Sequence, residues 1–516
     1  MIRPTTRHGR AAVVTVAALT VAAVAAPAIG ADGDNTRDAR QAIQGGKARS
    51  VILFLGDGMG DSEITIARNY LKGAAGTLSM DGLPLTGAYT TYAVREDNPR
   101  KPDYVTDSAA SGTGWATGRK TYNGAISVTP QGKKPLKTIL ELAQDAGYAT
   151  GDVTTARVTD ATPAVLASHI NDRGCEGPQD LAADCPAFLK ENGGLGSIAE
   201  QEVEHNLDVL MGGGLDKFSQ TIPGGRYGGL TVLQQAQVAG YQLVTDSASL
   251  KKAKADRKVL GLFGEGTLPT RWAGPPATPY VPGSNSNNPI ACSTPNPDLP
   301  AGQPSVEAMT SKAISLLNTK QLGNRKGFFL QVEGASIDKQ DHAQNPCGQI
   351  GETADFDRAV AVGRRYALEH PDTLVVVTAD HGHTSQITYN SQTDSNHSPG
   401  LLATLTTKDG VPMTLNYATN LQGRSQTHTG TQVRIAAQGP QAANVLGVTD
   451  QTDLFGTMAR AMRGVDISKA GVIPTPRGDT SRPATPKAPV VKAPTPKLPP
   501  GPGAGRAPAA PVSAAG

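Results

Sequence analysis

The sequence contains few aromatic residues, little charge and only four cysteines. Aromatic side chains make up 4% of the 516 residues, charged side chains make up 18%, and the formal net charge is +3. So small a net charge argues against the broad basic surface that nucleic-acid-binding proteins carry. Beyond residue 30, no apolar stretch reaches the length of about 20 residues that a membrane-spanning helix requires. We therefore expect neither a nucleic-acid partner nor a membrane-embedded domain.

The first thirty residues have the features of a secretion signal. Arg3, Arg7 and Arg10 precede an apolar, alanine-rich run over residues 11–26, and small residues at 26–30 offer cleavage sites. The run is short for a membrane anchor, and no Arg-Arg pair precedes it to indicate the twin-arginine route. We expect the mature protein to be secreted, periplasmic or associated with the cell wall.

The four cysteines all lie in the mature part of the chain. None belongs to a Cys-x-x-Cys motif, so a cysteine-based zinc site is the weaker interpretation. An even number in an exported chain predicts two disulfides, with three possible pairings. Because Cys175 and Cys185 are close in sequence, we expect them to pair, which leaves Cys292 for Cys347.

Strand and helix patterns alternate along the central part of the chain. Apolar runs that favour strands occupy residues 51–55, 148–153, 328–332 and 374–378. Apolar residues at helical spacing occupy residues 136–146, 306–317 and 355–367. This alternation predicts an α/β fold, in which a central, mostly parallel sheet is flanked by helices.

Three regions depart from this alternation. Residues 264–304 are rich in proline, glycine and asparagine and predict a cap or surface insertion. Residues 401–407 and 413–419 predict a hairpin. The basic C-terminal region is rich in proline and alanine, which predicts a disordered tail. This tail either contacts anionic cell-wall polymers or is solvated without a partner. The predicted division is a signal peptide (1–30), a flexible leader (31–46), a catalytic domain (47–465) and the tail (466–516).

Carboxylates follow three of the predicted strands. Asp57 comes after the first strand, Glu333 after the third, and the pair Asp380-His381 after the fourth. The carboxyl ends of parallel strands form the edge of a sheet where ligands bind. Three acids in one crevice repel one another unless cations offset their charge. The pattern therefore predicts a metal site.

Histidines extend the predicted ligand set. Asp338 and His342 are four residues apart, so on a helix both would face one ion; the alternative is an ordinary exposed acid and histidine. Mixed oxygen and imidazole ligands favour Zn²⁺, and oxygen ligands alone favour Mg²⁺. His428 is the best remaining candidate. The other mature histidines are expected either in packing or supporting positions (His169, His383) or at the surface (His205, His370, His397).

Ser108 is the candidate nucleophile. It precedes an alanine-rich helical stretch, and a helix N-terminus offers free N–H groups to a phosphate. The alternative is that Asp107 or Ser108 only caps this helix. A serine hydroxyl needs a base or a metal ion to become an effective nucleophile. No Gly-x-Ser-x-Gly motif surrounds Ser108, which argues against an acyl-transfer triad.

Six motifs occur together in one order along the chain. They are Asp-Gly-Met-Gly-Asp at 57–61, Asp-Ser-Ala at 107–109, Asp-Ala-Thr-Pro-Ala at 160–164, Glu-Gly-Ala-Ser-Ile-Asp at 333–338, Asp-His at 380–381 and His-Thr-Gly at 428–430. In this order they resemble the motifs of bacterial alkaline phosphatases, and the agreement extends from about residue 50 to residue 463. The resemblance implies a phosphomonoesterase, which acts on small phosphate monoesters, with two zinc ions and one magnesium ion.

The resemblance also implies a role for each matching residue. One zinc ion would contact the leaving-group oxygen and be held by Asp338, His342 and His428. The other would activate Ser108 and be held by Asp57, Asp380 and His381. The magnesium site would consist of Asp57, Asp160, Thr162 and Glu333, with Asp160 acting through water.

Further implications concern the phosphate and the assembly. Arg173 resembles the family's phosphate-clamping arginine, and guanidinium geometry suits bidentate binding. Asp107 and Lys339 are expected to support the phosphate or the ligands. Lys339 and Asp160 match the form of the family that lacks paired histidines at these positions, which favours magnesium. The resemblance supports both disulfide pairs and implies a homodimer.

The predicted reaction has two displacements at phosphorus. Ser108 attacks the ester to form a phosphoserine, which water then hydrolyses, a reaction suited to phosphate scavenging. The alternatives are a related phosphodiesterase or sulfatase, a non-enzymatic phosphate-binding protein, and a structural protein with bound ions. Sulfatases need a Cys-x-Pro-x-Arg or Ser-x-Pro-x-Arg motif, which the sequence lacks.

Overall fold

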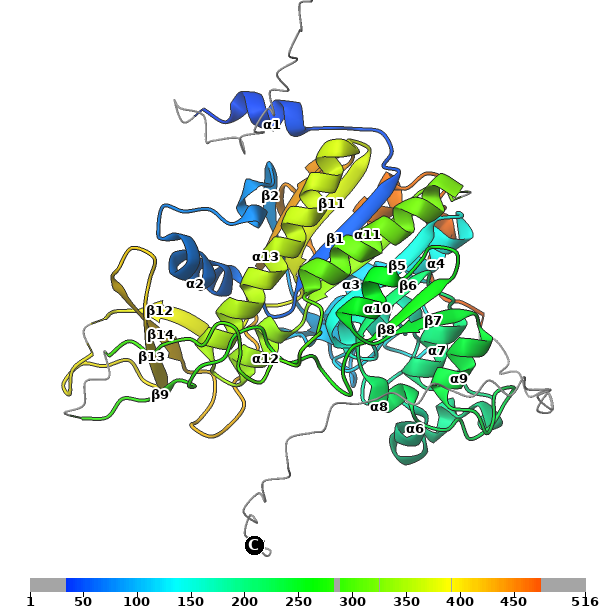
Figure 1. The fold of residues 1–516 in the computed structure, drawn as a ribbon, viewed down its shortest axis with the longest axis horizontal. Helices are drawn as coiled ribbons and strands as arrows, with labels where there is room; N and C mark the ends of the chain where they lie inside the picture. The colour runs from blue at the N-terminus through cyan, green and yellow to red at the C-terminus, as the bar shows by residue number, and fades with distance from the viewer. Residues whose placement is uncertain (1–33, 283–287, 324, 391, 475–516) are drawn as a thin grey trace, which may run out of the picture.

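The strand that precedes Asp57 lies at the centre of a ten-stranded sheet (Figure 1). The computed structural model describes residues 34–474 except 283–287, 324 and 391, so the predicted signal peptide lies outside it. Strand β1 (Ser50–Gly56) pairs in parallel with β10 (Phe328–Gly334) and β11 (Thr373–Ala379). Every residue of these three strands is buried, as their continuous apolar runs predict.

The predicted mostly parallel sheet is confirmed. Its order is β16 (Gly447–Asp450), β2 (Leu85–Thr90), β15 (Val433–Gln438), β11, β1, β10, β5 (Ala149–Arg157), β6 (Val209–Gly213), β8 (Lys258–Leu262) and β7 (Tyr241–Val244). Strand β15 runs antiparallel to both of its neighbours, and the other pairings within the described sheet are parallel. The carboxyl ends of β1, β10 and β11 therefore meet at one edge.

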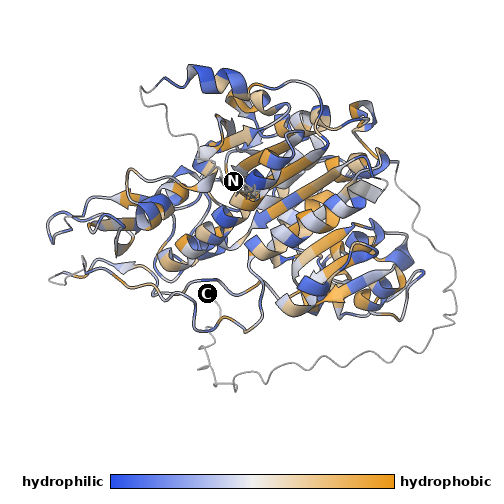
Figure 2. Ribbon diagram, turned by 45° about the horizontal axis from the view of Figure 1, so that its top comes forward, coloured by the Kyte–Doolittle hydropathy of each residue, from blue (hydrophilic) through white to orange (hydrophobic). Residues whose placement is uncertain are grey.

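Helices cover both faces of the sheet. The long helices α11 (Val306–Gly323) and α13 (Pro346–Glu369) pack side by side across β10 and its neighbours. The second face carries α3 (Ser108–Thr117), α4 (Ile139–Asp145), α5 (Ala161–Ala167) and α14 (Asp453–Ala461). Hydrophobic residues are concentrated in the strands between these two layers (Figure 2).

Two helices begin elsewhere than their apolar spacing predicts, because polar caps decide the first turn. Helix α13 begins at Pro346 and not at residue 355, since Asn345 accepts the N–H of Gly348 at 3.1 Å. Helix α4 begins at residue 139 and not at 136. Thr138 and Glu141 form a reciprocal capping box there, in which Glu141 Oε2 accepts the N–H of Thr138 at 2.7 Å.

A smaller four-stranded sheet stands beside the main one. It contains β12 (Ser385–Thr388), β14 (Pro412–Tyr417), β13 (Leu401–Thr406) and β9 (Thr278–Pro279). Strands β13 and β14 are the predicted hairpin, and β9 comes from the predicted insertion. The Cys292–Cys347 disulfide joins this insertion to the start of α13, and Cys175–Cys185 closes a short loop. Both predicted cysteine pairs are confirmed.

The remaining elements connect these layers or precede them. They are α1 (Thr36–Ala42), α2 (Asp61–Lys72), η1 (Ser79–Gly82), β3 (Ala93–Val94), β4 (Pro102–Asp103), α6 (Pro178–Asp184), η2 (Pro186–Phe188), η3 (Lys190–Asn192), α7 (Ile198–Glu204), α8 (Leu215–Phe218), α9 (Val232–Val238), α10 (Ser247–Lys252), α12 (Ser336–His342), η4 (Ala442–Val445) and η5 (Ile467–Lys469). Over the described ranges, no helix is both long and apolar enough to cross a membrane.

Both ends of the described chain contain local structure, a helix at one end and main-chain hydrogen bonds at the other. The segment predicted as a flexible leader contains α1, a helix without a buried residue. At the other end, the first residues of the predicted tail are hydrogen-bonded to the loop before α4. Ile473 donates its N–H to the carbonyl of Pro135 at 2.9 Å, and Lys137 donates to Gly471 at 2.8 Å. The tail from residue 475 onward lies outside the described residues.

Asp81 joins helix α2 to strand β15 through two arginines. Arg68 donates to both of its carboxylate oxygens at 2.7 and 2.8 Å, and Arg434 donates to Oδ1 at 2.7 Å. Burial would raise the pKa of Asp81, but the arginines lower it to about 2. The carboxylate therefore stabilises the fold at pH values above its ordinary pKa of 3.8, and this contribution is lost as the pH falls through about 2.

We expect Asp81→Asn to lower the free energy of unfolding at pH 7 by about 1–3 kcal/mol, because two arginines lose a charged partner. Calorimetric melting of both proteins under identical conditions measures the effect. Asp97→Asn is a matched control, since Asp97 pairs with Arg95 in the same bidentate way but both side chains are more than half exposed. Equal melting temperatures for the two variants would contradict the prediction.

Candidate active site

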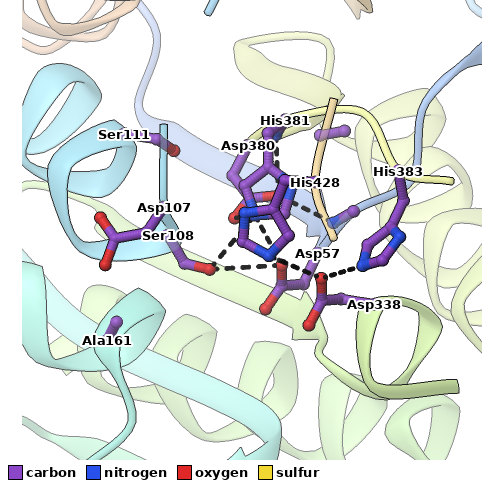
Figure 3. A network of polar contacts seen from close by, with 12 residues as sticks. Asp57, Asp107, Ser108, Ser111, Ala161, Asp338, Asp380, His381, His383 and His428 are labelled. Carbon is purple, nitrogen blue, oxygen red and sulfur yellow. Dashed lines mark hydrogen bonds and ion pairs between the residues drawn. The ribbon is translucent and has the colours of Figure 1, made fainter. Parts of the chain in front are cut away.

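The carboxyl edge of the sheet brings Asp57, Asp380 and His381 together. Gly56 pairs with Gly334 on one side and with Ala379 on the other, so the residues that follow these strands emerge at one level. His381 Nε2 lies 3.1 Å from Asp380 Oδ2 and 3.5 Å from Asp57 Oδ1. One ligand atom of each of these three buried residues lies within 4.8 Å of the others (Figure 3).

The ionisation of this first cluster favours a bound cation. His381 Nδ1 faces the carbonyl of Gly382 at 3.3 Å and donates to it, so in the neutral ring Nε2 presents a lone pair to the two carboxylates. Burial raises the pKa of Asp57 well above its ordinary value, and the carboxylates of Asp338 and Asp380 raise it further. Asp380 Oδ2 is buried and accepts no hydrogen bond among the described residues. A cation would bind the lone pair of His381, reduce the repulsion between Asp57 and its neighbouring carboxylates, and give Asp380 Oδ2 a partner.

A second cluster forms around Asp338 on helix α12. His342 lies on the same face of this helix, as the four-residue spacing predicts, and its Nε2 is 3.4 Å from Asp338 Oδ2. His428 Nε2 lies 3.3 Å from Asp338 Oδ1 and 3.1 Å from His342 Nε2. His342 Nδ1 faces the carbonyl of Gln426, and His428 Nδ1 faces the carbonyl of Thr106. Two imidazole lone pairs therefore converge with a carboxylate, which is the usual setting of a zinc ligand set.

His383 lies in the second cluster but has the opposite tautomer. Its Nδ1 accepts the N–H of Thr384 at 2.8 Å, so the neutral ring carries its hydrogen on Nε2. That nitrogen lies 3.1 Å from Asp338 Oδ1. Burial lowers the pKa of His383 to about 4, which keeps the ring neutral. His383 therefore orients Asp338 and has no lone pair left for a metal ion.

The residues predicted for magnesium are divided between two groups. Glu333 is buried and accepts a hydrogen bond from Thr154, and burial raises its pKa to about 7. Thr162 Oγ1 is also buried, without a hydrogen-bond partner in the described structure. Asp160, in contrast, accepts from Lys339 Nζ at 2.9 Å and from Arg173 Nη2 at 2.9 Å. Two cations thus already satisfy Asp160.

Ser108 is the first residue of α3, and Asp107 is its cap. Asp107 Oδ1 accepts the N–H of Ala110 at 2.9 Å, so the capping role belongs to Asp107 and the serine hydroxyl is free of it. Ser108 Oγ lies 3.4 Å from Asp57 Oδ1 and 3.4 Å from His381 Nε2. Figure 3 shows the hydroxyl directed at the first cluster. The hydroxyl is therefore adjacent to a metal-capable cluster at a helix N-terminus.

Arg173 links the cap of helix α3 to Asp160, the carboxylate that also binds Lys339. Its Nη1 donates to Asp107 Oδ2 at 3.1 Å, and its other contact is with Asp160. About one-third of its side chain is exposed, so the guanidinium is held in place and still accessible. Its own main chain is fixed by Gly124, whose carbonyl accepts the Arg173 N–H at 2.8 Å, and the Cys175–Cys185 disulfide follows two residues later.

Gly58 allows the two clusters to approach each other. Its φ is +64°, and a Cβ on this residue would lie 3.0 Å from the Cβ of Asp338. Glycine avoids both the strain of positive φ and this contact. The Gly58 N–H also donates to Asp380 Oδ1 at 2.8 Å. The turn after β1 thereby lies against one acidic residue of each cluster.

The sequence does not reveal the groups that orient the ligands. The carbonyls of Thr106 and Gln426 are backbone atoms of distant segments, and Gln451 supports Asp380 by donating to its carbonyl at 2.8 Å. No local motif marks these three residues. The place of His383, two residues after His381, is the one signal that points to its role.

The family of the chain follows from comparison with known proteins. The sequence model of the family described as alkaline phosphatase matches residues 48–425 and 406–463. These ranges include both clusters, Ser108 and Arg173. The chain belongs to the alkaline phosphatase family.

Curated alkaline phosphatases cover most of the chain. The protein is 51% identical over 434 residues to alkaline phosphatase of Escherichia coli, across 83% of this chain and 89% of that protein. It is 53% identical over 419 residues to streptomycin-6-phosphate phosphatase of Streptomyces griseus, across 80% of this chain and 90% of that protein. The chain is therefore a phosphomonoesterase of the alkaline phosphatase family.

Solved alkaline phosphatases share the fold. The enzyme from the Antarctic bacterium TAB5 superposes with a TM-score of 0.60 at 25% identity, over 81% of this chain and 99% of that one. A variant of the TAB5 enzyme, which superposes with a TM-score of 0.58 at 25% identity over the same shares of the two chains, is described with magnesium bound in its M3 site. The predicted fold class is confirmed, and the family's dependence on metal ions agrees with the two clusters.

Proposed function

We propose that this alkaline phosphatase hydrolyses phosphate monoesters through a phosphoserine at Ser108. The observation that supports this most is the position of Ser108 Oγ, 3.4 Å from both Asp57 and His381 and at the N-terminus of α3. Oγ attacks phosphorus, the bond from phosphorus to the ester oxygen breaks, and the alcohol leaves. Water then attacks the same phosphorus, which releases inorganic phosphate and restores the serine hydroxyl.

The two clusters fit zinc ions. Asp338, His342 and His428 would hold one ion, and Asp57, Asp380 and His381 would hold the other. The convergent imidazole lone pairs and the raised pKa of Asp57 support this proposal. When bound, such ions supply Lewis acidity that lowers the pKa of a hydroxyl and stabilises charge on a leaving oxygen.

Glu333, Thr162 and Asp57 are proposed to hold magnesium. The buried hydroxyl of Thr162 and the carboxyl of Glu333 offer the oxygen ligands that magnesium prefers. Because Lys339 and Arg173 already bind Asp160, we propose that Asp160 reaches the ion only through water.

Other residues of the chain bind the phosphate. We propose that Arg173 donates to two phosphate oxygens, a geometry that a guanidinium fork favours. Asp107 holds this arginine and caps α3, so it sets the distance between the arginine and the nucleophile. Lys339 adds positive charge and orients Asp160. Preorganised donors of this kind stabilise charge that develops on the phosphoryl oxygens.

We also propose that the protein is exported and releases phosphate outside the cytoplasm. The basic and apolar N-terminal segment and the two disulfides support export, because disulfides persist in oxidising compartments. Phosphate scavenging is the use that such a location favours. The homodimer and a contact of the tail with cell-wall polymers remain predictions.

Removal of metal ions tests the proposal. We expect chelation to lower p-nitrophenyl phosphate hydrolysis by at least about 100-fold, since the loss of metal catalysis removes several kcal/mol of charge stabilisation. Zinc with magnesium should restore the rate, and zinc alone should restore less of it. Metal analysis accompanies each assay, and an unchanged rate in a metal-free sample would refute the proposal.

Substrate comparison separates the alternatives. We expect a phosphate monoester to react faster than a matched diester or sulfate ester. A faster diester or sulfate reaction would favour a related enzyme of the superfamily, and phosphate retention without turnover would favour a binding protein. The same assay with streptomycin 6-phosphate tests whether the activity named for the S. griseus relative extends to this chain.

A further inference from the structure

A third group of potential ligands lies outside the catalytic site. Glu141 belongs to α4, His169 follows α5, and His205 ends α7. One ligand atom of each lies within 4.8 Å of the others. Glu141 Oε1 is 3.4 Å from His169 Nε2 and 3.2 Å from His205 Nε2. His205, which we expected at the surface, is thus partly buried in a cluster.

Backbone carbonyls fix the tautomers of both histidines. His169 Nδ1 faces the carbonyl of Ser127 at 3.0 Å, and His205 Nδ1 faces that of Gln201 at 2.9 Å. A carbonyl oxygen only accepts, so each Nδ1 carries the hydrogen and each neutral ring presents the lone pair of Nε2 to Glu141. Second partners of this kind orient metal-binding imidazoles.

A backbone group also fixes the orientation of the Glu141 carboxylate. Its Oε2 accepts the N–H of Thr138 at 2.7 Å, so Oε1 is the oxygen that faces the histidines. The carboxylate side chain is 13% exposed and that of His169 only 4%. Three lone-pair donors thus converge from three separate segments of the chain, each fixed by a backbone group on its far side.

The spacing suits a tetrahedral ion. Two ligand atoms that are each about 2.0–2.1 Å from a tetrahedral zinc ion lie about 3.3 Å apart. The two distances to Glu141 Oε1 match this value. They also match the spacing of the second catalytic cluster, in which Asp338 lies 3.3 Å from His428 and 3.4 Å from His342.

The cation-free alternative is an ion pair within the same cluster. The rings of His169 and His205 flank one carboxylate, with ring centroids 5.8 Å apart. Burial would raise the pKa of Glu141, but its contacts with His169 and His205 hold it below its ordinary range. Burial alone would lower the pKa of His205, but the contact with Glu141 outweighs burial and leaves the pKa above its ordinary value. A divalent cation would replace the proton that such a pair needs on the histidine, so a count of bound zinc distinguishes the two states.

We propose that Glu141, His169 and His205 bind a zinc ion that is additional to the catalytic metal ions. All three residues line a cavity of about 520 Å³, which Gln201, Lys190 and Tyr227 also line. Three protein ligands leave one position of a tetrahedral ion open, and this position faces the cavity, where water or a small anion completes the set.

The ion joins a segment that serves the active site. His169 lies between Asp160, which caps α5, and Arg173, which follows four residues later. The ion therefore ties the segment that holds the proposed phosphate ligand to α4 and α7. The ion connects segments of the chain and contacts no reacting atom. Loss of the ion should therefore leave the chemistry at Ser108 intact.

Metal counting on the intact enzyme tests the proposal. We expect wild type equilibrated with excess Zn²⁺ and then desalted to retain one more zinc ion per chain than His205→Ala, while the hydrolysis rates differ by less than about twofold. His397→Ala is the matched control, because His397 is exposed, stacks on Tyr280 with ring centroids 4.3 Å apart and belongs to none of the proposed ligand sets. This variant should retain the wild-type count.

Two further measurements keep the proposal falsifiable. His205→Gln, a milder change, should lose the same ion if His205→Ala fails to fold. Anomalous diffraction at the zinc edge should show a peak between Glu141 and the two histidines in wild type. Equal zinc counts in wild type and the folded His205 variant, or no peak at this cluster, would overturn the proposal and leave the direct contacts of Glu141 with the two histidines as the explanation of the cluster. Because the comparison is a difference of one ion, it is independent of the number of catalytic metal ions.

Discussion

Ser108→Ala should lower kcat/KM for p-nitrophenyl phosphate by at least about 100-fold, or about 2.7 kcal/mol of transition-state stabilisation. The variant loses the only protein atom that the proposed mechanism attaches to phosphorus. His381 keeps its contacts with Asp57 and Asp380, so the metal content and the melting temperature should remain close to those of wild type.

Ser111→Ala is the matched control for this prediction. Ser111 is a buried serine one turn further along α3, and its hydroxyl accepts from Gln451 at 3.3 Å. The Ser111→Ala variant should retain most of the wild-type activity. Wild-type enzyme quenched in acid during turnover should carry phosphate on Ser108, as located by mass spectrometry. Near-wild-type turnover by Ser108→Ala would refute the assignment of the nucleophile.

Asp338→Asn should have an effect of similar size through a different route. It replaces the carboxylate that faces His342, His428 and His383 with a neutral amide of the same shape. We expect the loss of one tightly bound ion per chain and a fall in kcat of at least about 100-fold, since the leaving oxygen loses its cation. Metal analysis and steady-state kinetics on the same sample measure both effects.

His383→Ala separates a ligand from a residue that orients one. Since its Nδ1 accepts from Thr384, we expect the alanine variant to bind the ion about 10- to 100-fold more weakly and to recover in excess zinc. Asp338→Asn should not recover in this way. If both variants lost the ion to the same extent and neither recovered, His383 would be a ligand and the tautomer argument would be wrong.

The sequence predicted the central strands and the residues at their ends well. Strands β1, β10 and β11 are covered on both faces, so they appear as unbroken apolar runs, and the polar residues that follow them lie at one edge of the sheet. Asp57, Glu333 and Asp380 could be selected for this reason. The i, i+4 spacing of Asp338 and His342 likewise placed both on one face of α12.

Features that depend on contacts between distant segments could not be predicted. Apolar spacing does not show that Asn345 starts α13 nine residues early, because a single cap decides it. The pairing of Asp160 with Lys339 and Arg173 depends on three separate segments. Glu141 and His205 are 64 residues apart, and only the packing of α4 against α5 and of α5 against α7 brings them together.

The contact between residues 471–473 and the loop before α4 sets a limit on shortening the protein. A chain cut at residue 465, the predicted end of the catalytic domain, would lose the main-chain partners of Pro135 and Lys137. It would also lose Ile473 from the wall of the cavity beside Glu141. A chain cut after residue 474 keeps all of these contacts, so a deletion that removes the basic tail for crystallisation or expression should begin there.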